Sequence, residues 1–302
     1  MFKHRFASKS KKQKILTVLG WAVLMLLLGA VIIGLLNALV ADGEWDFGWS
    51  SYRYDETGYE MGSSTVFSTS IEALEIDWIE GEVIIEVAAD DTFISVTETS
   101  EGTLSENEIM RRAVSADGKV LLVKFCKSAA FLGFGGVEEK TLIVRVPARM
   151  MGQLNRISVN ADEADVQMRG VDCASVFINS TSGDLSLLGN YQALSATTTT
   201  GDISVDAAVT GAVTLNTKGG DIKTSHAIAP ESMTAITAKG DVEVNLPADI
   251  GFTLRLDCDR DALSSDRMLT ENGEQYTYGD GKVQISLKSS RGQVRIGTRP
   301  TA

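Results

Sequence analysis

Hydrophobic residues recur in a fixed arrangement around a short turn that is repeated along the chain. The copies align on the residue that follows each turn glycine or its equivalent: Glu82, Asp165, Asp184, Asp202, Asp221, Asp241 and Gln293. In every copy, the positions eight and six before this residue, and one and three after it, are apolar, except for Thr224. Because only 44% of the whole chain is hydrophobic, chance does not account for this agreement.

The spacing predicts two short strands joined by the turn. Residues two apart lie on one face of a strand, so both apolar pairs point to the same interior. From Asp165 to Asp241 the copies are 19, 18, 19 and 20 residues apart, and one such unit cannot bury its apolar face alone. We therefore predict an all-β fold, a single-stranded parallel β-solenoid similar to a β-helix. A further, distorted coil is expected at Phe252–Cys258, near the end of the stack.

The repeated Gly-Asp step allows two interpretations, a structural corner or a calcium-binding loop. Calcium-binding β-rolls use a nonapeptide with several glycines, and this chain lacks that glycine spacing. We expect Gly201 to adopt a backbone conformation that is unfavourable for other residues, and Asp202 to accept hydrogen bonds from local amides of its own turn. We assign no catalytic, metal or cofactor role to the predicted corners, which are Gly81, Glu82, Ala164, Asp165, Gly183, Asp184, Gly201, Asp202, Gly220, Asp221, Gly240, Asp241, Gly292 and Gln293.

The region between the first two copies is less regular. The sequence "SENE" at 105–108 is a capping box and predicts a short helix through Ala113. Residues 119–125 and 140–146 have the composition of strands. Between them, residues 131–134 (FLGF) form either a hairpin turn over one end of the solenoid or an apolar tip for a partner or the membrane.

Residues 15–41 form an apolar stretch without a charged residue, which at ~1.5 Å per residue is long enough to cross the ~30 Å hydrocarbon core as a helix. Basic residues lie only on its N-terminal side, which predicts that residues 1–14 are a cytoplasmic tail. A cleaved signal peptide would have a shorter apolar core, so we expect an uncleaved signal anchor. Ala30, Gly34 and Ala38 share one helix face, a candidate surface for packing against a second copy.

The remainder divides into a connector and one domain. Residues 42–66 combine aromatic, glycine and acidic residues, which is typical of a linker close to the membrane surface. Residues 67–299 are the predicted extracytoplasmic β-solenoid domain.

Charge and composition exclude several functions. Residues 1–41 hold six of the 28 Lys and Arg residues and none of the 40 Asp and Glu residues, so the remainder has a net charge of −18. A domain this acidic repels phosphates, which argues against nucleic-acid binding. The chain has two histidines, too few for a multi-histidine metal site. Cys126, Cys173 and Cys258 are expected to be reduced and buried, with one disulfide of undetermined pairing as the alternative.

The units "SGDL", "TGDI", "GGDI" and "KGDV", followed by "VNLPADIGFTLRL" and "SSRGQVRIG", resemble a bacterial putative-adhesin family of unknown function with β-strand repeats. The resemblance covers roughly residues 70–297. It implies a β-solenoid behind a single membrane helix, and it supplies no catalytic residues. Ala164-Asp165 and Gly292-Gln293 depart from the usual Gly-Asp step, and the long span from Glu82 to Asp165 departs from a regular tandem array.

The sequence favours a membrane-anchored, non-enzymatic module of the bacterial cell envelope, acting in binding or sensing or as an adhesin-like scaffold. Its expected partners are the lipid bilayer, through residues 15–41, and an unidentified envelope protein or glycan. One alternative is a structural β-solenoid that assembles into a homo-oligomer. A less favoured alternative is an enzyme that hydrolyses glycans with stacked carboxylates such as Asp184 and Asp202.

Overall fold

The computed structural model describes residues 58–66, 70–127, 139–258, 262–273 and 275–299. The chain divides into two compact units, and all of these residues belong to the one that comprises 55–128 and 137–302. Within these ranges no helix has the length and hydropathy needed to span a membrane. The predicted membrane helix at 15–41, with Ala30, Gly34 and Ala38, lies outside the described residues, as does the FLGF segment at 131–134.

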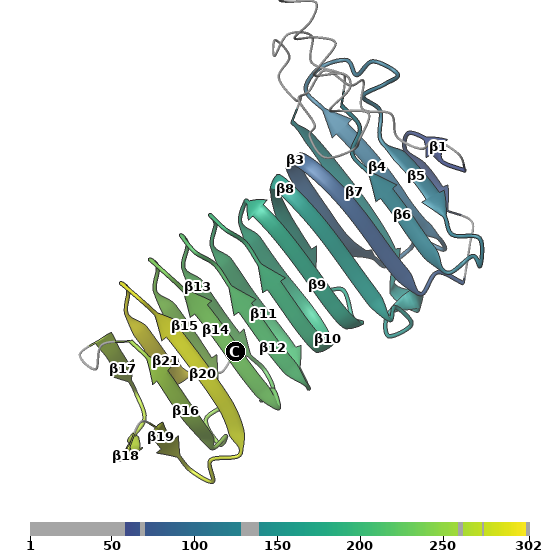
Figure 1. The fold of residues 1–302 in the computed structure, drawn as a ribbon. Coiled ribbons are helices and arrows are strands. Elements are labelled where there is room, and N and C mark those ends of the chain that lie inside the picture. Colours follow the sequence, from purple (N-terminus) through teal and green to yellow (C-terminus); the bar gives the residue numbers. More distant parts are fainter. Residues whose placement is uncertain (1–57, 67–69, 128–138, 259–261, 274, 300–302) are drawn as a thin grey trace, which may run out of the picture. The chain divides into compact units, whose positions relative to one another are not determined.

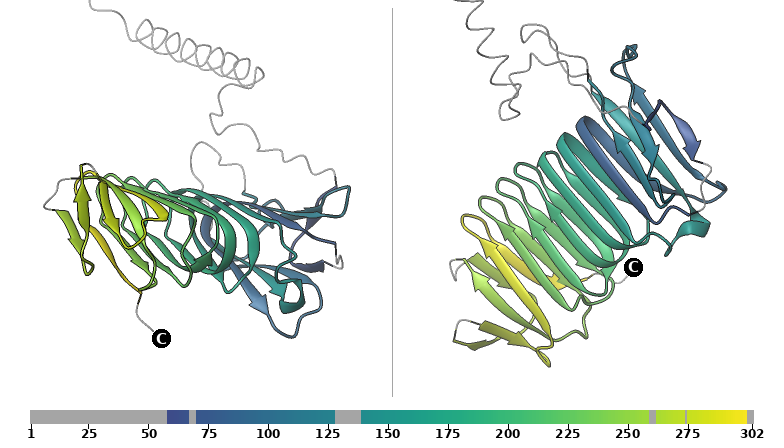
Figure 2. Two further views of the ribbon diagram at one scale, coloured as in Figure 1. Left: turned by 90° about the horizontal axis from the view of Figure 1, so that it is seen from below. Right: turned by 45° about the vertical axis from the view of Figure 1, so that its right-hand side comes forward.

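The described residues form an all-β fold in which 21 strands join one large, mostly parallel sheet, consistent with a β-solenoid (Figure 1). They include a short 3-10 turn, η1 (Ala148–Met150). Each coil contributes a strand before its corner, in what we call ladder A, and a strand after it, in ladder B. Figure 2 shows the same succession of coils from two other directions.

Both ladders run through the whole stack. In order of pairing, ladder A contains β1 (Glu60–Met61), β5 (Arg111–Val114), β6 (Val120–Lys124), the first half of β3 (Ala73–Ala88), the first half of β8 (Arg156–Arg169), β9 (Cys173–Ser182), the second half of β10 (Leu185–Thr197), β12 (Ala212–Asn216), β14 (Ser232–Thr237), β20 (Val283–Ser289), β16 (Phe252–Asp257), β19 (Gln275–Tyr278) and β18 (Thr270–Asn272). Ladder B contains β2 (Ser64–Val66), β4 (Ile94–Ser100), β7 (Lys140–Pro147), the second halves of β3 and β8, the first half of β10, β11 (Ile203–Val209), β13 (Ile222–His226), β15 (Val242–Leu246), β21 (Val294–Thr298) and β17 (Leu263–Ser265).

The register of the central coils agrees with the sequence repeat. Leu185 pairs with Ile203, Ile203 with Ile222, and Ile222 with Val242. Every repeated apolar position is buried, and together these side chains form one continuous core. Thr224, the polar exception, is fully buried and its hydroxyl lies 2.6 Å from Nε2 of His226. The inward positions predicted from the pattern are therefore confirmed.

The coils do not stack in the order of the sequence at either end. Near the C-terminus, Ala235 of β14 pairs with Leu287 of β20, which pairs in turn with Leu256 of β16. The chain therefore passes over one position, forms the terminal coil, and returns to fill the gap with β20 and β21. At the other end, Ile76 of β3 lies between Val123 of β6 and Val159 of β8, so β3 is also enclosed by later segments.

The prediction of purely parallel pairing is wrong at the ends of the stack. β1, β2, β4, β5, β18 and β19 all pair antiparallel. These strands belong to the segments where the chain reverses direction, and the outermost of them are only two or three residues long. Short edge strands offer few free backbone groups to another chain, so the reversal closes the stack.

The predicted helix through Ala113 is also wrong. The backbone amide and hydroxyl of Ser105 both hydrogen-bond to Oε2 of Glu108, at 2.8 and 2.6 Å, so the capping box forms. The chain makes a single turn and Arg111 then begins β5, which pairs with β6. A helix this short is marginal by itself, so pairing in the sheet determines the conformation.

Candidate functional site

The corner aspartates form hydrogen bonds that link each coil to the next. Oδ1 of Asp165 accepts a hydrogen bond from the backbone amide of Asp184, and the same contact of about 2.8 Å links each later corner to the next. In the same way, the backbone amide of Asp202 donates to Asp184, that of Asp221 to Asp202, that of Asp241 to Asp221, and that of Gln293 to Asp241. The expectation that Asp202 accepts from amides of its own turn is therefore wrong, because its donor lies in the neighbouring coil.

The corner glycines are required by close backbone contact between coils. A Cβ atom added at Gly220 would lie 1.9 Å from the carbonyl oxygen of Gly201, and one at Gly240 would lie 2.1 Å from that of Gly220. Gly201 has a positive φ of 159° and Gly183 one of 129°, values that L side chains rarely adopt, so the expectation for Gly201 is confirmed. Close contact with the backbone of the preceding coil, together with the positive φ of Gly183 and Gly201, explains why this position is glycine in the central coils.

Buried hydroxyl groups complete the corners at Gly220, Gly240 and Gly292. Oγ1 of Thr237 accepts a hydrogen bond from the amide of Gly240 at 3.1 Å and donates to the carbonyl of Gly220, in the preceding coil, at 2.9 Å. Thr217 and Ser289 make the same pair of contacts in their coils. The corner is thus a repeated unit of hydroxyl, glycine and carboxylate whose polar groups bind one another.

The atypical corners occupy equivalent places. Gly81 has φ of +101°, and an added Cβ would lie 2.3 Å from the carbonyl oxygen of Lys140. Glu82 accepts a hydrogen bond from the side chain of Gln167, and the carbonyl of Ala164 lies against Gly183. Among the described residues, no group of three or more His, Cys, Asp or Glu side chains could hold a metal ion. The structure thus brings together the predicted corner residues as one ladder, whose central members are linked by hydrogen bonds from coil to coil.

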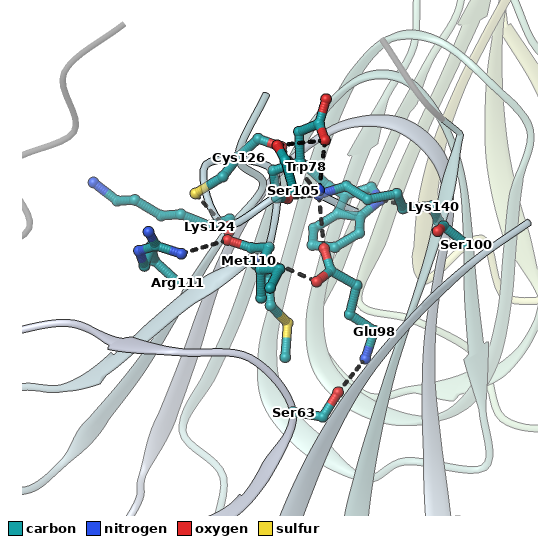
Figure 3. Close-up of polar contacts among 12 residues, drawn as sticks. Ser63, Trp78, Glu98, Ser100, Ser105, Met110, Arg111, Lys124, Cys126 and Lys140 are labelled. Carbon is teal, nitrogen blue, oxygen red and sulfur yellow. Dashed lines mark hydrogen bonds and ion pairs between the residues drawn. The ribbon is translucent and has the colours of Figure 1, made fainter. Parts of the chain in front are cut away.

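A buried ion pair closes the N-terminal end of the core, and the sequence pattern does not indicate it. Nζ of Lys140, at the start of β7, lies 2.7 Å from Oε1 of Glu98 on β4, and the two side chains are 1% and 3% exposed (Figure 3). The ammonium also donates to the carbonyls of Glu108 (2.6 Å) and Cys126 (3.0 Å). It lies 3.7 Å from the centroid of the Phe125 ring.

The remaining groups around this pair are also satisfied. The other carboxylate oxygen of Glu98 accepts a hydrogen bond from the amide of Met110 at 2.9 Å, and Nε1 of Trp78 donates to the carbonyl of Lys140. Trp78 and Phe125 pack edge to face, with centroids 4.9 Å apart. An ammonium with three acceptors has no free lone pair for nucleophilic chemistry, so this cluster serves stability.

A second cation lies on aromatic rings near the C-terminal coil. The guanidinium of Arg267 donates to the carbonyls of Leu246 (2.8 Å), Pro247 (2.9 Å) and Ile250 (3.1 Å). It lies 4.9 Å from the ring of Tyr278. The two ends of the stack are therefore closed by the same kind of contact, a cation between aromatic rings and backbone carbonyls.

Two concave regions lie on the surface of the stack, and the larger of them includes the corner residues Gly81, Glu82 and Asp165. An acidic groove of about 760 Å³ includes Glu82, Glu101, Glu139 and Asp165 in its lining. Burial, followed by the charges of Glu163 and Glu139, raises the pKa of nearby Glu80. A smaller pocket of about 330 Å³ is lined mainly by small residues, with Asp172 hydrogen-bonded to Asn190 and Asp206 paired with Arg299 at 2.9 Å.

Cys126, Cys173 and the described histidine are buried, whereas Cys258 is partly exposed. The three cysteines are reduced, so none of the alternative disulfides forms. Burial raises the pKa of Cys173 to about 11, which keeps it protonated and unreactive. Burial lowers the pKa of His226 to about 4, so the imidazole is neutral at pH 7.

These features define a repeat protein of stacked β-coils, and comparison with known proteins gives its family. Residues 71–297 match the Toastrack DUF4097 family, so the chain belongs to that family. This agrees with the resemblance to putative adhesins of unknown function that the repeats indicate. No curated protein matches the chain.

Three solved structures are similar to the chain at low sequence identity. A putative cell adhesion protein from Clostridium sporogenes is 12% identical, with a TM-score of 0.34, and the match covers 80% of this chain and 100% of that one. Putative adhesins from Bacteroides fragilis and Parabacteroides merdae are each 13% identical, with TM-scores of 0.42 and 0.37. Those matches cover 78% and 80% of this chain, and 97% and 94% of the other chains.

The corner geometry predicts different outcomes for two adjacent glycines. Gly220→Ala should lower the free energy of unfolding by about 1–3 kcal/mol or more, because the new methyl group overlaps the Gly201 carbonyl. Gly219→Ala is the matched control: its nearest neighbour would be 3.5 Å away, so the change should be small. Urea unfolding of both variants measures the difference, and equal stabilities would contradict the proposed steric role.

The buried ion pair predicts that removing one partner destabilises the fold strongly unless the other partner is also replaced. Lys140→Met leaves the Glu98 carboxylate buried without its cation, which should cost about 3–5 kcal/mol of stability. Adding Glu98→Gln to this variant should recover part of that loss. Thermal and urea unfolding of the single and double variants test this, and a Lys140→Met protein as stable as the wild type would refute it.

His226 predicts a loss of stability in mild acid. Its folded pKa of about 4 lies below the unfolded value of about 6.5, so the unfolded chain binds more protons between these values. The stability that neutral His226 contributes is fully present above pH 6.5 and is lost as the pH falls toward 4. Between pH 7 and 4.5 the wild type should lose about 2–3 kcal/mol more than His226→Gln, measured by urea unfolding. Parallel losses in the two proteins would argue against the assignment.

Proposed function

We propose that this protein is a membrane-anchored, non-enzymatic scaffold that binds or senses a component of the bacterial cell envelope. Residues 15–41 would hold it in the plasma membrane as an uncleaved signal anchor, with residues 1–14 in the cytoplasm and the coiled domain outside. Family membership supports an adhesin-like extracellular scaffold, and the length and charge asymmetry of residues 15–41 support the anchor.

The observation that carries the non-enzymatic part of the proposal is the use of the corner carboxylates. Asp165, Asp184, Asp202, Asp221 and Asp241 each accept a backbone hydrogen bond from the next coil. A glycosidase needs one carboxyl group that acts as an acid and a second that acts as a base or nucleophile. Five equivalent carboxylates in equivalent environments favour a structural role over such a pair.

The ends of the stack disfavour the alternative of a self-assembling polymer. The outermost strands β1, β2, β17 and β18 are two or three residues long, and all except β17 pair antiparallel. Polymerisation end to end through a continuous parallel ladder would require long, open parallel edges. A scaffold that presents its sides to a partner is more consistent with this geometry.

Complementation in the native bacterium tests the proposal. In a strain that lacks the protein, the full chain should restore the envelope phenotype. Neither residues 1–66 alone nor the outer domain released by a cleavable signal peptide should do so, because binding and anchoring are both required. Rescue by residues 1–66 alone would contradict a role for the outer domain, and rescue by the released domain would contradict the need for the anchor.

A further inference from the structure

One side of the central coils carries no charged residue. We define the neutral face as the outward side chains of β9, the second half of β10, β12 and β14: Ser175, Phe177, Asn179, Ala193, Ser195, Thr197, Ala212, Thr214, Asn216, Ser232, Thr234 and Ile236. In the chain as a whole 23% of the residues are charged, and outward positions on strands are where charges usually lie. The neutral face is therefore an exception in an acidic protein.

The surfaces around the neutral face are charged. Ladder A carries Arg156 and Asp77 on one side of it and Lys288 and Asp257 on the other. The outward side of ladder B holds ion pairs, with Arg145 2.9 Å from Glu86 and Lys223 3.9 Å from Glu243. The lack of charge is thus confined to four successive coils of one ladder.

The polar groups of the neutral face are free to bind a ligand. In the described part of the chain, its serine, threonine and asparagine side chains make no hydrogen bond to another group, whereas the buried corner hydroxyls are engaged. Hydroxyl and amide groups both donate and accept hydrogen bonds, as sugar hydroxyls do. These side chains are short, so little conformational entropy is lost when a ligand fixes them.

The neutral face repeats in register from coil to coil. Phe177 pairs with Ser195, Ser195 with Thr214, and Thr214 with Thr234, and a second row runs from Asn179 through Thr197 and Asn216 to Ile236. Adjacent strands lie about 4.8 Å apart, which is similar to the length of one pyranose ring in a polysaccharide. A sugar polymer laid across the coils would therefore meet at least one hydroxyl or amide side chain at each coil.

We propose that the neutral face binds an uncharged polysaccharide of the cell envelope. This inference rests on the proposed function and names the class of ligand. Phe177, 46% exposed at the edge of the face, would pack against the apolar side of a sugar ring, and the hydroxyl and amide rows would bind its hydroxyl groups. A second copy of this chain fits less well, because interface cores are more apolar and this face has only Phe177 and Ile236 as large apolar side chains.

Calorimetric titration of the full chain in phosphatidylcholine nanodiscs tests this, with maltohexaose and chitohexaose as neutral probes and hexagalacturonate as the anionic control. At least one neutral probe should bind and hexagalacturonate should not. Ser195→Lys, in the centre of the neutral face, should weaken binding about tenfold, and Phe177→Ala should also weaken it. Ser204→Lys, outward on ladder B, is the matched control and should leave the affinity within about twofold of the wild type.

Several results would overturn the inference. They are the absence of binding by both neutral probes below about 1 mM, tighter binding of hexagalacturonate, equal effects of the two lysine substitutions, and self-association that Ser195→Lys abolishes. Complementation separates this inference from the proposed function. If the Ser195→Lys protein binds no sugar and still rescues the deletion strain, the glycan assignment fails and the scaffold function stands. If the released outer domain rescues the strain, the anchored scaffold fails whatever the titration shows.

Discussion

The close approach of consecutive coils at the Gly-Asp corner is the contact on which the rest of this structure depends. At Gly220 the two backbones are so near that a methyl group cannot fit, and this proximity places the Asp221 amide 2.8 Å from the Asp202 carboxylate. The Thr217 hydroxyl spans the same gap to the carbonyl of Gly201. Because these contacts repeat at each coil, they keep the ladders in register and the apolar positions inside.

A stack of coils leaves two open ends, and the chain closes each with a buried cation. Lys140 and Arg267 both lie against aromatic rings and donate hydrogen bonds to backbone carbonyls. Lys140 also neutralises Glu98, whose side chain is 3% exposed. Closed ends direct any interaction to the sides of the stack, where one side of the central coils lacks charge and its polar groups are unengaged.

Much of the fold could be predicted from local pattern. Residues such as Leu185, Ile203 and Val213 recur at fixed distances from the turn, and the two-residue periodicity of a strand assigns each of them to the interior. The corner residues were identified for the same reason. The donor to Asp202 was not, because hydrogen bonds between residues 18 to 20 positions apart depend on how coils stack, which a single repeat does not reveal.

The repeat, its inward positions and the family could be inferred from the sequence alone, because every copy shows the same spacing of apolar residues around the turn. Only the tertiary structure decided the order of the coils, the antiparallel caps and the pairing of Lys140 with Glu98. The capping box at Ser105 illustrates the reason: its hydrogen bonds form as the local sequence predicts, yet the segment that follows pairs with β6 instead of continuing as a helix. Local pattern specifies which face of a segment is buried, whereas the choice of neighbour depends on contacts between residues far apart in the chain.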